Sequence, residues 1–165
     1  MSTANVPFET TLLVRDRCLC LHVQRAARTL ARRFDEVLRP FDLTNGQFSL
    51  MMSLNRPKPP GMGEVAALLA MDRTTLTAAL KVLESRGLVK VTADAGDRRS
   101  RLLALTPKGR GLLARAVPVW KHAHREVEGF LPDGDADRLR TNLRALSRSS
   151  VANWEPGHLP TGKAK

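Results

Sequence analysis

The stretch from Gly61 to Gly109 constrains the fold more than any other part of the chain. It holds two short segments with apolar residues at helical spacing, followed by two apolar runs typical of strands around a polar turn. The second helical segment opens at Asp72, a residue type that caps helix N-termini. It stops at Gly87, a residue type common just past helix C-termini. This order predicts two packed helices followed by an antiparallel hairpin.

The helix predicted after Asp72 has a core face and a face without bulky apolar groups. Leucines at helical spacing form the core face, whereas the opposite face is small, polar and basic. Such a face suits a helix in the major groove of DNA. Threonines in it also have a structural interpretation, because their hydroxyls can bond to the local backbone. We predict contacts to base edges or nearby phosphates from Arg73, Thr74, Thr75 and Thr77, and a phosphate contact from Lys81.

The turn between the two strands concentrates positive charge. Its sequence, DAGDRRSR, combines turn-forming aspartates and a glycine with three arginines. A basic hairpin tip beside a DNA-reading helix can contact phosphates or insert an arginine into the minor groove. We predict that Arg98 inserts and that Arg99 forms a structural pair with Asp97. Exchanged roles for the two arginines also fit the sequence.

The hairpin resembles that of the MarR family of winged helix-turn-helix transcription regulators. The family's wing signature is Asp-x-Arg, five residues, Leu-Thr and, three residues later, Gly, and it is matched by Asp97, Arg99, Leu105, Thr106 and Gly109. The resemblance covers about residues 15–150 and is strongest in this part. It implies a mainly α fold with a small β-hairpin wing (α+β) and long dimerisation helices. It also implies that Arg98 and Arg99 belong to the DNA-contacting wing and that Asp97 helps to hold an arginine in place.

Long amphipathic helices are predicted on both sides of this part. The first runs from about Leu12 to Leu38, the second begins after Thr106 and should kink at Pro118, and a third covers about residues 135–151. The apolar stripe of the first helix is too long to be buried by a small domain, so we predict a homodimer. The predicted organisation is a mobile N-terminal arm (1–14), a helical dimerisation region (15–40 and 107–152), a winged helix-turn-helix DNA-binding domain (41–106) and a disordered tail (153–165).

Charge and missing motifs narrow the function further. The chain has 27 basic and 16 acidic residues, a net charge of +11, which favours an anionic partner such as double-stranded DNA. It contains no HExxH, Walker or Gly-x-Ser-x-Gly motif, and His122 and His124 would face different sides of a helix. We therefore predict that it is no enzyme and binds no metal or cofactor. Without a signal sequence or membrane-spanning run, we expect a cytoplasmic protein with no membrane partner.

Two sets of residues are candidates for a regulatory switch. His22, Arg25, Met51 and Trp120 could converge on an apolar pocket for a small aromatic or anionic effector, although each also fits a core or surface role. Cys18 and Cys20 are candidates for redox sensing. On one continuous helix, however, residues two apart point about 200° away from each other, so these thiols could not pair without unwinding it.

These observations together predict a transcription regulator of the MarR type. In this hypothesis it is a repressor that binds a short palindromic operator as a homodimer and is released by a small-molecule effector. Two alternatives stay open. One is a cysteine-based redox-sensing regulator, and the other is an architectural winged-helix protein that binds DNA without an effector.

Overall fold

The computed structural model describes residues 5–97, 100–132 and 134–148. The chain divides into two compact units, residues 1–123 and 124–165. Over the described ranges it is mostly helical with one small antiparallel sheet, which confirms the predicted fold class. No helix in these ranges is long and apolar enough to cross a membrane.

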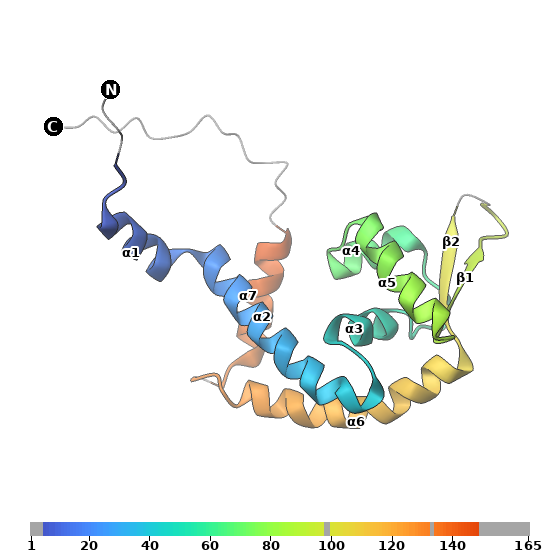
Figure 1. Ribbon diagram of the computed structural model, residues 1–165. Coiled ribbons are helices and arrows are strands. Elements are labelled where there is room, and N and C mark those ends of the chain that lie inside the picture. The colour runs from blue at the N-terminus through green and yellow to red at the C-terminus, as the bar shows by residue number, and fades with distance from the viewer. Residues whose placement is uncertain (1–4, 98–99, 133, 149–165) are drawn as a thin grey trace. The chain divides into compact units, whose positions relative to one another are not determined.

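The helix pair and the hairpin predicted within residues 61–109 lie in the first unit and are labelled α4, α5, β1 and β2 in Figure 1. With the helix that precedes them, the elements are α3 (Asn45–Ser53), α4 (Met62–Leu69), α5 (Arg73–Ser85), β1 (Val89–Ala93) and β2 (Arg101–Leu105). The strands pair antiparallel, with Val89 opposite Leu105 and Ala93 opposite Arg101. We refer to these three helices and the hairpin as the winged unit.

Local sequence signals set the ends of these helices. Thr44 and Gln47 form a capping box before α3, with Thr44 Oγ1 accepting from the Gln47 N–H at 3.2 Å and Gln47 Oε1 accepting from the Thr44 N–H at 3.1 Å. Gly87 follows α5 at φ 67°, a left-handed conformation that lets the Leu88 N–H reach the Leu83 carbonyl at 2.9 Å. Ala70, in the turn before α5, also adopts a positive φ, of 50°.

The core of the winged unit is completed by apolar residues that precede and follow the unit in the sequence. Leu76, Leu80 and Leu83 of α5 are almost fully buried, as predicted from their spacing. They belong to a cluster that also includes Leu38, before the unit, and Leu113, after it. The winged unit therefore depends for its packing on residues beyond α3 and β2.

The N-terminal helix differs from the prediction. Two helices, α1 (Phe8–Arg17) and α2 (Leu19–Leu38), replace the single helix expected from Leu12, and α1 occupies part of the segment expected as a mobile arm. The break lies at Cys18, whose extended ψ of 104° interrupts the helical backbone. Cys18 Sγ accepts from the Leu21 N–H at 3.5 Å, so the side chain caps the new helix.

The remaining helices follow the prediction more closely. A short 3-10 helix, η1 (Arg39–Phe41), ends α2, and α6 (Pro107–Glu128) leaves the hairpin and continues through Pro118, where a kink was expected. α7 (Ala136–Arg148) begins where the Arg138 N–H donates to Asp135 Oδ1 at 2.7 Å. The predicted end of this helix, residues 149–151, and the predicted tail lie outside the described residues.

Candidate nucleic-acid interface

The first turn of α5 is fixed by Asp72. Its Oδ1 accepts from the Thr75 N–H at 2.8 Å, and its Oδ2 accepts from the Thr75 hydroxyl at 2.7 Å. The hydroxyl bond and then the backbone bond lower the pKa of the Asp72 carboxyl below its usual value. Thr75, predicted to contact DNA, thus has a structural role in the cap that involves its hydroxyl proton.

The other two threonines of α5 differ in their hydrogen bonding. The Thr77 hydroxyl donates to the Arg73 carbonyl at 2.7 Å, a back-bond within the helix that leaves its oxygen able to accept only. The Thr74 side chain is exposed, and its hydroxyl makes no hydrogen bond with the described residues. Of the three, Thr74 keeps both its donor and its acceptor available for a base edge or a phosphate.

The exposed face of α5 carries an open, shallow hollow. It has a volume of about 370 Å³ and is lined by Arg73, Thr74, Thr77, Ala78 and Lys81. Four of these are predicted DNA contacts, so the structure brings them together on one surface while the leucines of the opposite face hold α5 in the core. The Arg73 guanidinium extends towards Gly63 of α4.

The turn of the wing is held by hydrogen bonds between its polar residues. The Gly96 N–H donates to Asp94 Oδ1 at 2.9 Å, and the Ser100 hydroxyl donates to Asp97 Oδ2 at 2.9 Å. The Asp94 N–H donates to the Ser100 carbonyl at 3.1 Å and closes the loop. Arg98 and Arg99 lie outside the described residues, so their contacts with DNA and with Asp97 stay predictions. Ser100 is a partner of Asp97 that the sequence interpretation missed, although its three-residue spacing is typical of such turns.

The base of the wing is joined to the end of α5 by Thr106 and Gly109. The Thr106 hydroxyl donates to the Gly87 carbonyl at 2.7 Å and accepts from the Gly109 N–H at 3.0 Å. A Cβ atom at Gly109 would stand 2.1 Å from the Leu88 carbonyl oxygen, a distance that no side chain tolerates. These contacts give the Leu-Thr-x-x-Gly part of the motif a physical reason, which the sequence alone did not reveal.

A polar, basic helix face backed by a helix-turn-helix core, beside a hairpin with a basic tip, defines a winged helix-turn-helix DNA-binding protein. Residues 43–100 match the MarR family. The chain is 35% identical over 149 residues to the HTH-type transcriptional regulator TtmR of Methylorubrum extorquens, covering 90% of this chain and 75% of TtmR. This protein therefore belongs to the MarR family and is a DNA-binding transcription regulator.

Two solved structures support this assignment. One is the transcriptional regulator MosR of M. tuberculosis in complex with DNA, 39% identical with a TM-score of 0.75, covering 82% of this chain and 98% of MosR. The other is a structure of Bordetella bronchiseptica BpsR, whose DNA binding is regulated by 6-hydroxynicotinic acid. It is 26% identical with a TM-score of 0.72, covering 80% of this chain and 94% of BpsR.

The four residues predicted to form an effector pocket are not brought together within one chain. Met51 is completely buried, and Trp120 packs between Phe34 and Phe48, with ring centroids 6.2 and 5.7 Å away. Arg25 precedes Phe34 by nine residues, about 13 Å along α2. The exposed His22 lies one turn further away and contacts the Asp16 carbonyl oxygen from Nε2 at 3.2 Å. Met51 is therefore a core residue, because its side chain is fully buried within the hydrophobic cluster.

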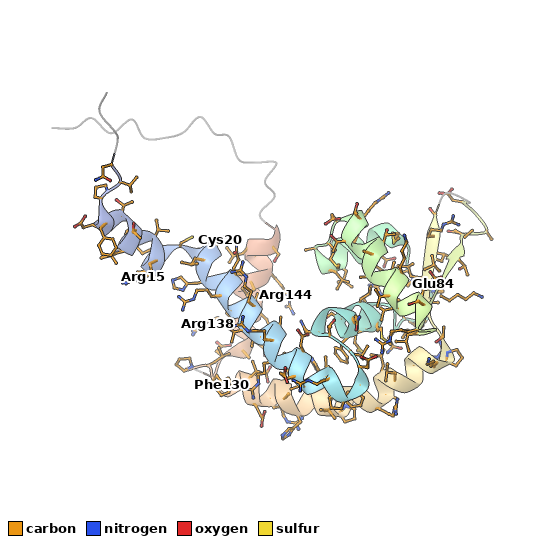
Figure 2. All side chains as sticks on the ribbon, in the orientation of Figure 1. Arg15, Cys20, Glu84, Phe130, Arg138 and Arg144 are labelled. Carbon is orange, nitrogen blue, oxygen red and sulfur yellow. The ribbon has the colours of Figure 1, made fainter. Side chains whose placement is uncertain are left out.

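The two cysteines are not on one continuous helix, contrary to the prediction. Cys18 lies at the break between α1 and α2, whereas Cys20 lies in the first turn of α2, where Figure 2 shows its side chain. Cys20 is exposed, and its Sγ accepts from Gln24 Nε2 at 3.1 Å. The separation of about 200° expected for two helical residues does not apply to these thiols, because Cys18 is not helical.

Proposed function

We propose that this regulator is a homodimeric repressor that recognises a short palindromic operator. The observation that carries the proposal is the hollowed, basic face of α5, which gathers Arg73, Thr74, Thr77 and Lys81. One such face makes few base contacts, and a second copy one helical turn of DNA away, about 34–36 Å, doubles the recognised sequence. Bound at a promoter in the cytoplasm, such a dimer would exclude the transcription machinery.

The apolar surface of the helices outside the winged unit supports the dimer. In α2, Leu19, Val23 and Leu30 are between 40% and 65% exposed, although they form one stripe. α7 likewise exposes Leu139, Leu143 and Leu146. Stripes of this kind are stable only when another helix covers them, and a second copy of the chain supplies matching helices.

The test is selection of bound sequences from random DNA, together with sedimentation of the free protein. We expect an inverted repeat and a dimer at micromolar concentration. Lys81→Met should weaken all sequences alike and flatten the salt dependence, whereas Thr74→Ala should relax sequence preference at a cost of roughly 1–3 kcal/mol. Lys121→Met, on an exposed part of α6, is the charge-matched control for Lys81. A monomer, or binding without sequence preference, contradicts the proposal; the latter result favours an architectural protein.

Release by a small molecule is the second part of the proposal. The comparison with BpsR, whose DNA binding is regulated by 6-hydroxynicotinic acid, supports an aromatic, anionic effector. Since one chain does not bring His22, Arg25 and Trp120 together, we place the pocket between the two copies. A hundredfold loss of DNA affinity requires about 2.7 kcal/mol of coupling between the two ligands. Titration of aromatic acids against the protein–DNA complex tests this, with Arg25→Met as the variant expected to lose the response.

The break at Cys18 favours redox sensing as a second candidate function. A peroxide would oxidise the two thiols to one disulfide and be reduced to an alcohol and water, or to two waters. Joining residues 18 and 20 would then remove the Cys18 cap of α2. We expect peroxide to release DNA from the wild type but not from a Cys18→Ser, Cys20→Ser double variant, if this mechanism operates. Equal release from both proteins excludes it.

A further inference from the structure

Arg86, the residue that ends α5, contacts the segment that joins α2 to α3. Its Nη2 lies 3.1 Å from Asp42 Oδ2, and its Nη1 donates to Gln47 Oε1 at 3.5 Å. The same Gln47 oxygen accepts from the Thr44 N–H in the capping box of α3. The Arg86 side chain therefore ties the C-terminal end of the recognition helix to the point where α2 ends and α3 begins.

The backbone of Arg86 is held from another direction. Lys108, in the first turn of α6, donates from Nζ to the Arg86 carbonyl oxygen at 2.8 Å. This carbonyl is one of those left unpaired at a helix C-terminus, where a cation is favourable. Asp42, which follows α2 and η1, and Lys108, in the first turn of α6, thus both reach Arg86 at the end of the recognition helix.

Leu83 anchors this end of α5 in the core, whereas on the side that faces the α2–α3 connection Arg86 is held by polar contacts. An open hollow of about 390 Å³ lies beside Arg86, with Asp35, Arg39 and Val82 on its walls. Val82, one turn before Arg86, is 47% exposed and so does not pack α5 against α2 on this side. Asp42 has a φ of 53°, fixed by its N–H donating to the Arg39 carbonyl at 2.8 Å, which sets its carboxylate at the rim of the hollow.

We propose that Arg86 is the positioning residue through which α2 and α6 set the direction of the recognition helix. The inference rests on the proposed function, since direction matters only where two recognition helices must match two half-sites. Asp42 and Lys108 act through Arg86 and touch no base. Loosening either contact leaves the DNA-binding face of each recognition helix intact but lets the distance between the two recognition helices of the dimer vary. The protein should then bind a palindrome less tightly and a single half-site as tightly as before.

The experiment measures binding of full-length protein to two duplexes, the selected palindrome and the same duplex with one half-site scrambled. The variants are Asp42→Asn, which suits the left-handed backbone, and Lys108→Met. Because an exposed ion pair is weak, we expect each to lower palindrome affinity about three- to fivefold and to leave half-site affinity unchanged. The double variant should also accept palindromes with one base pair more or fewer between the half-sites.

Matched controls remove the general effect of charge on DNA affinity. Glu36→Gln is the control for Asp42→Asn, because it removes a carboxylate that pairs with Arg39 at the C-terminal end of α2. Lys121→Met is the control for Lys108→Met, because it removes a cation from the same helix, α6. Wild-type protein that binds both duplexes equally overturns the proposed function and, with it, this inference. A wild-type preference for the palindrome that is unchanged in both variants overturns the inference alone. Equal weakening of both duplexes does so too, since it indicates a direct phosphate contact or partial unfolding.

Discussion

The winged unit and the helices outside it reach stability in different ways. The winged unit buries its leucines within one chain, and its helices begin and end at capping contacts a few residues away. α2 and α7 form equally regular helices but leave their apolar stripes exposed. The difference indicates that one chain suffices to bury the core behind the DNA-binding surface, whereas the stripes of α2 and α7 are left for the second copy in the proposed dimer to cover.

The largest effect should come from core truncation in the winged unit. Leu76→Ala removes a completely buried side chain and should cost about 2–5 kcal/mol of unfolding free energy, independent of protein concentration. Leu30→Ala on α2 should matter only at concentrations where the dimer forms. Thermal unfolding of both variants over a hundredfold range of concentration checks this. A concentration-dependent loss for Leu76→Ala would break the comparison.

Closure of the wing base should have the next largest effect. Gly109→Ala forces a Cβ against the Leu88 carbonyl oxygen and should cost about 1–3 kcal/mol. Gly111→Ala, two residues along α6 with no atom within 4 Å of the added Cβ, should instead stabilise by up to about 1 kcal/mol. Denaturant unfolding of the two variants gives the signs. Similar changes in unfolding free energy for both variants would show that Gly109 of α6 does not pack tightly against the Leu88 carbonyl.

The Asp72 cap should make the winged unit sensitive to acid. Since the folded pKa lies below the unfolded one, its stabilisation is complete above the unfolded value and is lost as pH falls through the folded value. Asp72→Asn keeps an acceptor for Thr75 but cannot titrate, so its melting temperature should fall less between pH 5 and pH 3 than that of the wild type. Parallel curves of melting temperature against pH for the two proteins would show that Asp72 is not responsible for the acid sensitivity.

The smallest effect concerns the turn between α4 and α5. Ala70 has a positive φ that disfavours a Cβ, so Ala70→Gly should stabilise by about 1 kcal/mol or less. Gly87→Ala, at φ 67°, should have the opposite sign and a similar size. Thermal unfolding of the pair tests whether the ends of α4, at Ala70, and of α5, at Gly87, are set by local backbone preference. Two changes of the same sign would argue against it.

Features encoded by neighbouring residues were predictable from the sequence. Asp72 and Gly87 bound α5, as expected, and the alternating apolar residues gave both strands. The break at Cys18 was not predictable, because no proline or glycine lies there and the stripe of α2 continues the earlier pattern. Contacts between distant residues, such as Asp42 with Arg86, carry no periodic signal at all.

The candidate site shows the same division. The basic face of α5 follows from helical spacing, and the structure gathers four of its five predicted residues around one hollow. Spacing alone could not reveal that Thr75 serves the cap, since its hydroxyl is shared with Asp72 only once the helix has formed. The core alternative for Met51 could not be chosen from the sequence for a related reason, because α3 is apolar on several sides and its pattern does not identify the buried one.

The hydrogen bonds that Thr106 makes with Gly87 and Gly109 determine where the winged unit could be excised and fused to another protein. They reach back across the whole hairpin to residues 87 and 88, so the natural boundary of a transplantable module lies after them. A chimaera that ends the module at residue 106 would keep the hydroxyl but let a foreign residue replace Gly109. Grafts of this recognition surface onto other scaffolds should therefore carry the chain past Arg110, whose guanidinium donates to the Leu105 carbonyl at 2.8 Å, and through Leu113, which belongs to the same core cluster as the leucines of α5.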